Sequence, residues 1–141
     1  MKKFLLLLMF FPSTSFAVCE ERMAILAGGW SNHFIARGSG EPEWNEDHEG
    51  IIFECNKWSY GSFINSQGNE AIGIGKNLFI NKHKTYDWSL YLGAWSGYDY
   101  GITGAGIVPV GAFRFNVNYK ALEVNTWLTP VVGVVTIGWE F

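Results

Sequence analysis

The last segment of the chain alternates between two kinds of side chain. Every second residue from 133 to 141 lies on one face, which carries Gly133, Val135, Ile137, Trp139 and Phe141. The segments 106–117 and 120–129 alternate in the same way. A period of two is typical of a β-strand whose two faces meet different surroundings. The 17 glycines are spread along the chain, and each would cost a helix interior about 1 kcal/mol. The pattern therefore predicts an all-β fold.

Turn-forming residues divide the chain into eight segments of strand length. Runs rich in Gly, Asn, Ser and Pro separate these segments, and no linker or internal repeat is visible, so we expect the 141 residues to contain one domain. Eight such strands fit a soluble sandwich or lipocalin-like barrel. They also fit a small transmembrane barrel, whose strands need about 9–11 residues. The predicted strands are 23–35, 49–56, 58–65, 70–79, 88–97, 106–117, 120–129 and 131–141.

The first residues have the features of a secretory signal. Two lysines precede an apolar run at residues 4–11. Small residues, Ser15 and Ala17, then stand at the two positions that a signal peptidase reads, which predicts cleavage after Ala17. The apolar run is too short to span a bilayer as a helix, which needs about 20 residues. We therefore expect residues 1–17 to be a signal peptide and residues 18–141 to form the mature domain.

Three features favour a membrane barrel over a soluble one. Aromatic residues stand near strand ends, as in an interfacial girdle, at Trp88, Trp139 and Phe141. The opposite faces carry charges that suit a polar lumen, at Glu54, Arg114, Glu123 and Glu140. The terminal aromatic residue resembles the assembly signal of bacterial outer-membrane barrels. We expect an eight-stranded antiparallel up-and-down transmembrane β-barrel in the outer membrane, with a secreted soluble β-domain as the alternative.

The charge of the chain argues against a nucleic-acid partner. Only 16% of the residues are charged, the formal net charge is −3, and no basic stripe appears. Zinc-ligand spacing, phosphate loops and nucleotide fingerprints are absent from the sequence, so we expect no cofactor and no resident metal. We expect a monomer whose partners are membrane lipids. Acidic residues surround His48 in either an ordinary solvated loop or a divalent-cation site, at Glu41, Glu43, Glu46, Asp47 and Glu49.

With both termini in the periplasm, this topology brings distant residues to the same rim. His33 and Ser66 both reach the outer rim, where a His and a Ser can form a base and a nucleophile if the strand ends converge. Cys19 and Cys55 both reach the periplasmic rim. A disulfide between them is geometrically reasonable, and two unpaired cysteines are the alternative. Lipidation of Cys19 is disfavoured by the valine before it.

Several short motifs occur in an order that resembles a known family, PagP, the lipid A palmitoyltransferases of Gram-negative outer membranes. The resemblance covers most of the mature chain and is closest to the short PagP-like barrels of phage and environmental sequences. Each motif alone is weakly specific, and their shared order is the stronger signal. The motifs are residues 30–34, 62–66, 72–75, 92–95, 107–110, 126–130 and 137–141.

The resemblance implies an enzyme that moves palmitate from a phospholipid to lipid A. The family uses a His on the first strand and an Asp-Ser pair at the end of the third, which correspond to His33, Asn65 and Ser66. Prolines at the family's lateral gate correspond to Pro109 and Pro130. The family's apolar slot for the acyl chain corresponds to the inward faces that carry Gly73, Gly75, Trp95, Val108, Val110, Ala112 and Trp127.

One departure from the family bears on catalysis. Asn65 replaces the Asp, and an amide can orient an imidazole through a hydrogen bond but cannot stabilise its charged form as a carboxylate does. Asp99 or Glu70 is a candidate substitute. The sequence therefore leaves two readings, an acyltransferase that uses Ser66 and His33, and a non-catalytic outer-membrane barrel that binds lipid or modifies the cell surface.

Overall fold

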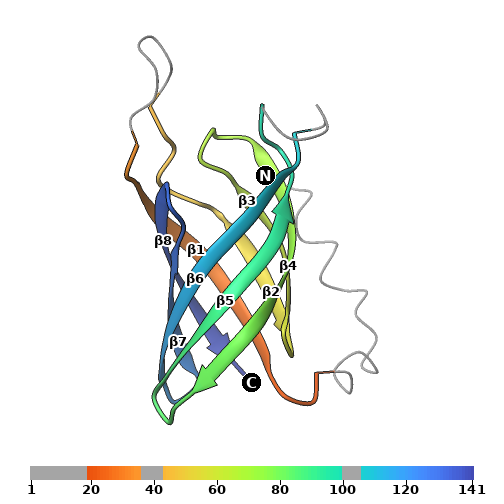
Figure 1. Ribbon diagram of the computed structural model, residues 1–141, viewed down its shortest axis with the longest axis vertical. Coiled ribbons are helices and arrows are strands. Elements are labelled where there is room, and N and C mark those ends of the chain that lie inside the picture. Colours follow the sequence, from red (N-terminus) through yellow and green to blue (C-terminus); the bar gives the residue numbers. More distant parts are fainter. Residues whose placement is uncertain (1–18, 36–42, 100–105) are drawn as a thin grey trace.

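The chain forms a closed barrel of eight antiparallel strands (Figure 1). The computed structural model describes residues 19–35, 43–99 and 106–141. The predicted signal peptide at 1–17 lies outside these residues. The all-β, eight-stranded antiparallel barrel expected from the sequence is confirmed. Its strands are β1 (Met23–His33), β2 (Gly50–Cys55), β3 (Trp58–Ile64), β4 (Glu70–Lys82), β5 (Tyr86–Trp95), β6 (Val108–Tyr119), β7 (Leu122–Leu128) and β8 (Val132–Glu140).

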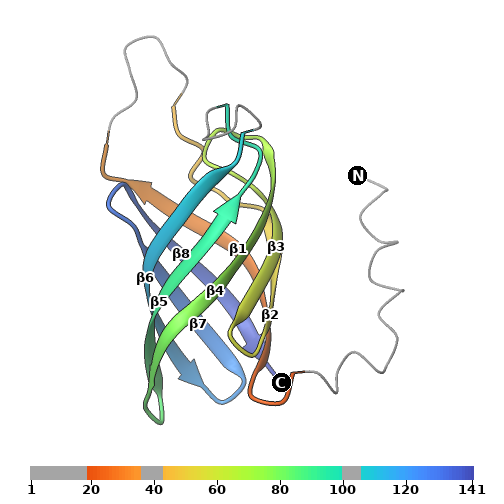
Figure 2. The same ribbon diagram turned by 45° about the vertical axis from the view of Figure 1, so that its right-hand side comes forward.

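Each strand pairs with the next one in sequence, and β8 pairs with β1 to close the barrel. Closure removes the two free outer edges that an open sheet would have. The strands are tilted relative to the long axis (Figure 2). The β1–β2, β3–β4, β5–β6 and β7–β8 connections lie at one end, which we call the loop end. The three tight connections and Phe141 lie at the other end, which we call the turn end.

Two predicted turns lie a few residues from their observed positions. The turn expected at 118–119 forms at Lys120 and Ala121, with Lys120 in the left-handed region at φ 57°. Asn118 remains in β6 because it pairs with Glu123 and accepts a hydrogen bond from Asn116 inside the barrel. The turn expected at 81–84 forms after Lys82, because β4 and β5 stay paired as far as Lys82 and Asp87.

A β-bulge in β1 reverses which residues face the interior. The register against β8 shifts between Ala27 and Trp30, and Gly28 has a φ of +66° that favours glycine. Before the bulge, Leu26 is buried inside. After it, Ser31 is buried and Trp30 is 54% exposed. The bulge therefore turns Ser31 and His33 toward the interior at the loop end.

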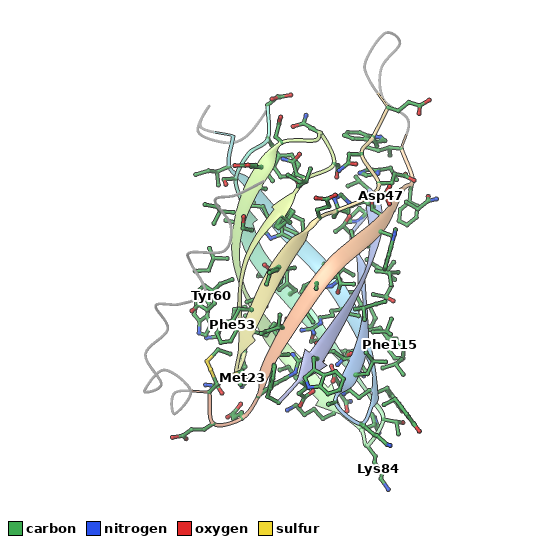
Figure 3. The ribbon with its side chains drawn as sticks, turned by 180° about the vertical axis from the view of Figure 1, so that it is seen from behind. Met23, Asp47, Phe53, Tyr60, Lys84 and Phe115 are labelled. Carbon is green, nitrogen blue, oxygen red and sulfur yellow. A yellow bond between two sulfur atoms is a disulfide. The ribbon has the colours of Figure 1, made fainter. Side chains whose placement is uncertain are left out.

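The two surfaces of the barrel have opposite chemistry. The wall exposes an almost continuous set of apolar side chains, including the predicted girdle residues Trp88, Trp139 and Phe141. The buried side chains are largely polar or charged at the turn end and become apolar toward the loop end. Figure 3 shows the wall residues from behind, with Asp47 at the loop end and Lys84 at the turn end. The barrel is therefore apolar outside and polar in the turn-end half of its interior.

A network of paired charges fills the turn-end half of the interior. Arg114 donates to both oxygens of Glu54, at 2.8 and 3.0 Å, and also to Asn125. Arg22 forms ion pairs with Glu54 and with Glu123. All of these side chains are almost completely buried. We call Arg22, Glu54, Arg114, Glu123 and Asn125 the charged plug.

Arg22 belongs to this plug although it precedes the first strand. Burial opposes its charge, but the carboxylates of Glu54, Glu123 and Glu140 outweigh this and hold the pKa of the guanidinium above its usual value. Arg22 was not among the residues predicted to lie in the lumen. Its alternation in step with the inward-facing Ala24 and Leu26 is the signal that could have found it.

A disulfide fastens the segment that carries Arg22. Cys19 and Cys55 are bonded, with their Cα atoms 5.0 Å apart. The bond joins the residues before β1 to the turn-end terminus of β2, next to Glu54. It therefore holds one side of the charged plug together.

We predict that Arg114→Met lowers the free energy of unfolding by about 3–5 kcal/mol, because it leaves buried carboxylate charge without one of its partners. Denaturant unfolding of the barrel in detergent measures this change. Lys84→Met, which removes an exposed charge at the turn end, is the control and should change the stability little. Equal stability of the two variants would show that the plug does not hold the barrel together.

Candidate functional site

An apolar cavity of about 80 Å³ occupies the loop-end half of the barrel. Its floor contains Tyr91 and Trp127, whose rings pack edge to face with centroids 5.0 Å apart. The Trp127 ring also lies 4.8 Å from the Arg114 guanidinium, so it separates the cavity from the charged plug. Phe63 and Trp95 pack edge to face at 5.1 Å on another side. The cavity is therefore a blind apolar slot whose aromatic floor lies above the charged plug.

The depth of this slot is close to the thickness of one lipid leaflet. Along β3 and the residue after it, the lining residues run from Ser59 to Asn65, which at ~3.3 Å per residue is ~20 Å along the chain. With a strand tilt of ~40° this corresponds to ~15 Å along the barrel axis. One leaflet is about half of a ~30 Å hydrocarbon core. The residues that line the slot therefore extend over about the depth of one leaflet.

Three of the seven predicted slot residues line the cavity, namely Gly73, Trp95 and Trp127. Val110 and Ala112 belong to the apolar cluster around Tyr91, and Val108 has the same facing at the loop end of β6. Gly75 lies beneath the Tyr91 ring, which a Cβ at position 75 would overlap. Tyr91 and Phe63 also line the cavity and were not predicted. Tyr91 alternates in step with Trp95 on β5, which is the signal that could have found it.

The residues just before β2 continue its course between β1 and β3. Residues 43–49, which we call the rim segment, form backbone hydrogen bonds to both neighbours. The backbone amide of His48 donates to the Gly29 carbonyl at 2.8 Å, and the Ser31 amide donates to the Glu46 carbonyl at 2.8 Å. The Asn45 amide donates to the Ser66 carbonyl, also at 2.8 Å. The rim segment therefore lies between the two predicted catalytic positions.

His33 contacts the rim segment. Its ring stacks on Trp44 with centroids 4.5 Å apart, and its Nδ1 lies 3.6 Å from a carboxylate oxygen of Glu46. The side chain of His33 is nearly buried, whereas that of Glu46 is half exposed. The carboxylate beside His33 thus comes from Glu46, which the sequence analysis assigned only to the acidic loop. A carboxylate in this position can orient an imidazole and stabilise its charged form.

Asn65 is fully buried and uses its side chain to hold the β3–β4 connection. Its Oδ1 accepts hydrogen bonds from the amides of Gln67 and Asn69, and its Nδ2 donates to the Gly97 carbonyl at 2.7 Å. These bonds are those of a turn-stabilising Asn. Ser66 lines the cavity at its loop end.

His48 faces the cavity rather than the solvent. Its Nε2 lies 2.8 Å from the Ser31 hydroxyl oxygen, and its Nδ1 lies 2.8 Å from the Ile64 carbonyl oxygen. Across residues 19–35, 43–99 and 106–141, no group of three or more His, Cys, Asp or Glu side chains is arranged to hold a metal ion. Of the acidic loop, Glu41 lies outside the described residues.

The pairing of β6 with β7 ends before β6 does. The ladder begins at Phe113 and Leu128, so residues 108–112 of β6 extend beyond the β7–β8 hairpin. Pro109 lies in this extension, where it pairs with Ala94 of β5 and is exposed on the wall. Pro130 lies in the β7–β8 connection. Both predicted gate residues therefore flank the place where the ladder is interrupted.

Comparisons with protein-family models, curated proteins and solved structures find no match to this chain. Within the described part of the chain, no helix has the length and apolar character needed to cross a membrane.

We predict that Asn65→Asp destabilises the protein by about 1–3 kcal/mol, because a carboxylate has no donor for the buried Gly97 carbonyl. Thermal unfolding in detergent measures the effect. Gln67→Glu is the control, since it keeps the oxygen that accepts from the Asp99 amide. An Asn65→Asp protein as stable as this control would contradict the role in the turn.

Proposed function

We propose that the protein is an outer-membrane acyltransferase that takes one fatty acyl chain into its loop-end cavity and moves it from a phospholipid to lipid A or a related lipid acceptor. The observation that carries this proposal is the blind apolar slot, about one leaflet deep, with His and Ser residues at its mouth.

The apolar wall supports insertion into a membrane. In water, so many exposed aromatic and aliphatic side chains would aggregate, whereas lipid is a favourable surrounding for them. Closure supports insertion as well, because hydrocarbon cannot satisfy an open sheet edge. The wall residues include Ile72, Ile74, Leu90, Leu92, Phe113, Val124, Leu128 and Ile137.

The charges at the two ends support an orientation. Lysines gather toward the turn end, at Lys57, Lys76, Lys82, Lys84 and Lys120. Basic side chains near a membrane surface attract anionic headgroups. Acidic residues gather toward the loop end, including Glu43, Glu46, Asp47, Glu49 and Glu70. We infer that the turn end faces the phospholipid leaflet and the periplasm, and that the loop end faces the outer leaflet.

The charged plug argues against a pore. An eight-stranded barrel is wide enough only for its own side chains or one small ligand. Here the plug fills the turn-end half with paired groups, and Trp127 covers it. The free space is limited to the slot, which fits an acyl chain and offers no aqueous path through the membrane.

The loop-end part of β6, which extends beyond the end of its ladder with β7, supports sideways entry of lipid. Residues 108–112 lack a β7 partner, and a proline removes a backbone donor at position 109. A phospholipid in the outer leaflet reaches the slot through this interruption without leaving the membrane. At the rim, His33 beside Glu46 serves as a base, and Ser66 lines the slot that holds the ester.

The second candidate function is a non-catalytic barrel that binds lipid or modifies the surface. The observation that favours it is the commitment of Asn65 to its turn, which removes the family's Asp from the site. The two functions differ in whether the protein adds an acyl chain to lipid A.

We predict that Leu90→Arg, a charge placed near the middle of the wall, destabilises the barrel in a lipid bilayer by about 2–4 kcal/mol. Tyr119→Arg at the turn end is the matched control and should cost about 0–1 kcal/mol there. Guanidinium unfolding in bilayers gives both values. A soluble β-domain would show no such dependence on depth, and it would not fractionate with outer membranes.

We predict that cells expressing the protein contain lipid A with one additional acyl chain, detected by mass spectrometry. Ser66→Ala and His33→Ala should remove this species. Ser62→Ala, a serine on the outward face of β3, is the control and should retain it. Unchanged lipid A in cells with a correctly inserted barrel would reject the acyltransferase and favour the non-catalytic barrel.

A further inference from the structure

A hydrogen-bonded Ser–His pair, Ser31 and His48, lies beside the cavity, apart from the residues that the PagP resemblance identifies. Nε2 of His48 lies 2.8 Å from Oγ of Ser31, and Nδ1 lies 2.8 Å from the Ile64 carbonyl oxygen. A carbonyl oxygen can only accept a hydrogen bond, so Nδ1 carries the ring proton of the neutral imidazole. Nε2 then accepts the proton of the Ser31 hydroxyl. This is the order of bonds in an activated serine, with a base on the hydroxyl and a third group orienting the base.

Three adjacent segments build this pair. Ser31 comes from β1, His48 from the rim segment and the Ile64 carbonyl from the end of β3. The bulge at Gly28 turns Ser31 inward. Without the register shift, Trp30 would point into the barrel in place of Ser31. Gly29 faces this pair without a side chain. A Cβ at this position would lie 3.4 Å from the Cβ of His48.

The pair adjoins a place for an acyl chain. His48, Gly28 and Gly29 all line the apolar cavity. Ser31 is 9% exposed, so most of its surroundings exclude water. An ester whose chain fills the slot would hold its carbonyl group near the loop end, where His48 lines the cavity and holds the Ser31 hydroxyl by a hydrogen bond.

We propose that Ser31 is a nucleophile and His48 its general base, and that together they cleave a fatty acyl ester whose chain occupies the cavity. This inference rests on the proposed function, because it needs the acyl chain in the slot. It adds a covalent acyl-enzyme to that function. His33, Glu46 and Ser66 then serve the acceptor lipid at the same rim.

The reaction has two steps. Oγ of Ser31 attacks the ester carbonyl carbon while its proton passes to Nε2 of His48. The bond from that carbon to the alcohol oxygen breaks, the leaving alcohol takes the proton from Nε2, and the acyl group remains as an ester on Ser31. A hydroxyl of the acceptor lipid, or water, then gives its proton to Nε2 and attacks the acyl carbon. The proton returns to Oγ as the acyl group leaves, which restores Ser31 and His48.

A long-chain alkyl fluorophosphonate tests this pair directly, because its phosphorus bonds to an activated serine with loss of fluoride. The two candidate serines lie in different tryptic peptides. Ser31 is the single serine of the peptide 23–37, whereas Ser66 lies in the peptide 58–76. Mass spectrometry of the labelled full-length barrel in detergent therefore reports which serine reacts.

We expect the adduct on the peptide 23–37. Ser31→Ala should abolish it, and His48→Gln should slow labelling at least about 100-fold, the usual contribution of a general base. Ser62→Ala should label as the unsubstituted protein does. Labelling of the peptide 58–76 alone, or no labelling of a folded barrel, would overturn the inference. So would a Ser31→Ala protein that loses only stability, since that is the result expected of a hydrogen bond that merely anchors the rim segment.

The proposed function is tested separately, by measuring lipid A acylation in cells that express each variant. Loss of lipid A acylation in Ser31→Ala supports both proposals. Acylation that persists in Ser31→Ala and disappears in Ser66→Ala overturns the Ser31 nucleophile and keeps the acyltransferase. Unchanged lipid A together with an adduct on Ser31 rejects transfer to lipid A and supports the nucleophile, acting on another acyl ester.

Discussion

The pairing of Arg114 with Glu54 is the interaction on which the rest of the structure depends. These two groups are buried where isolated charges would be too costly, and Arg22, Glu123 and Asn125 complete their hydrogen bonds. The network ties β2, β6 and β7 to the segment before β1. It also determines where free space begins, because Trp127 lies on the Arg114 guanidinium and forms the floor of the cavity. A plugged lower half and an open upper half are therefore two consequences of one buried ion network.

The second controlling feature is the glycine bulge in β1. A strand that kept its register would present Trp30 and Asn32 to the interior. With Gly28 in the left-handed region, the same strand presents Ser31 and His33, next to the rim segment that supplies Glu46 and His48. A local change in backbone conformation thus gathers the polar chemistry at the mouth of an apolar slot. Bulges near functional sites commonly redirect side chains in this way.

Much of the fold could be predicted from the sequence, because alternation is a local property. The faces of β6, β7 and β8 follow directly from the residues at 106–141. The count of eight segments fits a sandwich as well as a barrel, and the aromatic strand ends with charged opposite faces favour the barrel. The bulge could not be predicted, since two glycines in a strand do not show which one adopts a positive φ. Glu46 and His48 were assigned to an acidic loop. Their inward orientation depends on backbone hydrogen bonds from the rim segment to β1 and to the end of β3, which the local sequence does not show. Arg22 was not predicted because it precedes the first strand, and its partners Glu54 and Glu123 lie 32 and 101 residues away.

The central claim is that one acyl chain enters the loop-end cavity and ends above Trp127. A phospholipid with a photoreactive diazirine at the methyl end of one chain tests it most directly, by cross-linking in a bilayer and locating the modified residue by mass spectrometry. The account predicts cross-links to Tyr91, Trp127 or Phe63, which line the slot. Cross-links confined to outward residues such as Ile72, Leu92 and Leu128 would contradict it, because the chain would then remain outside the barrel.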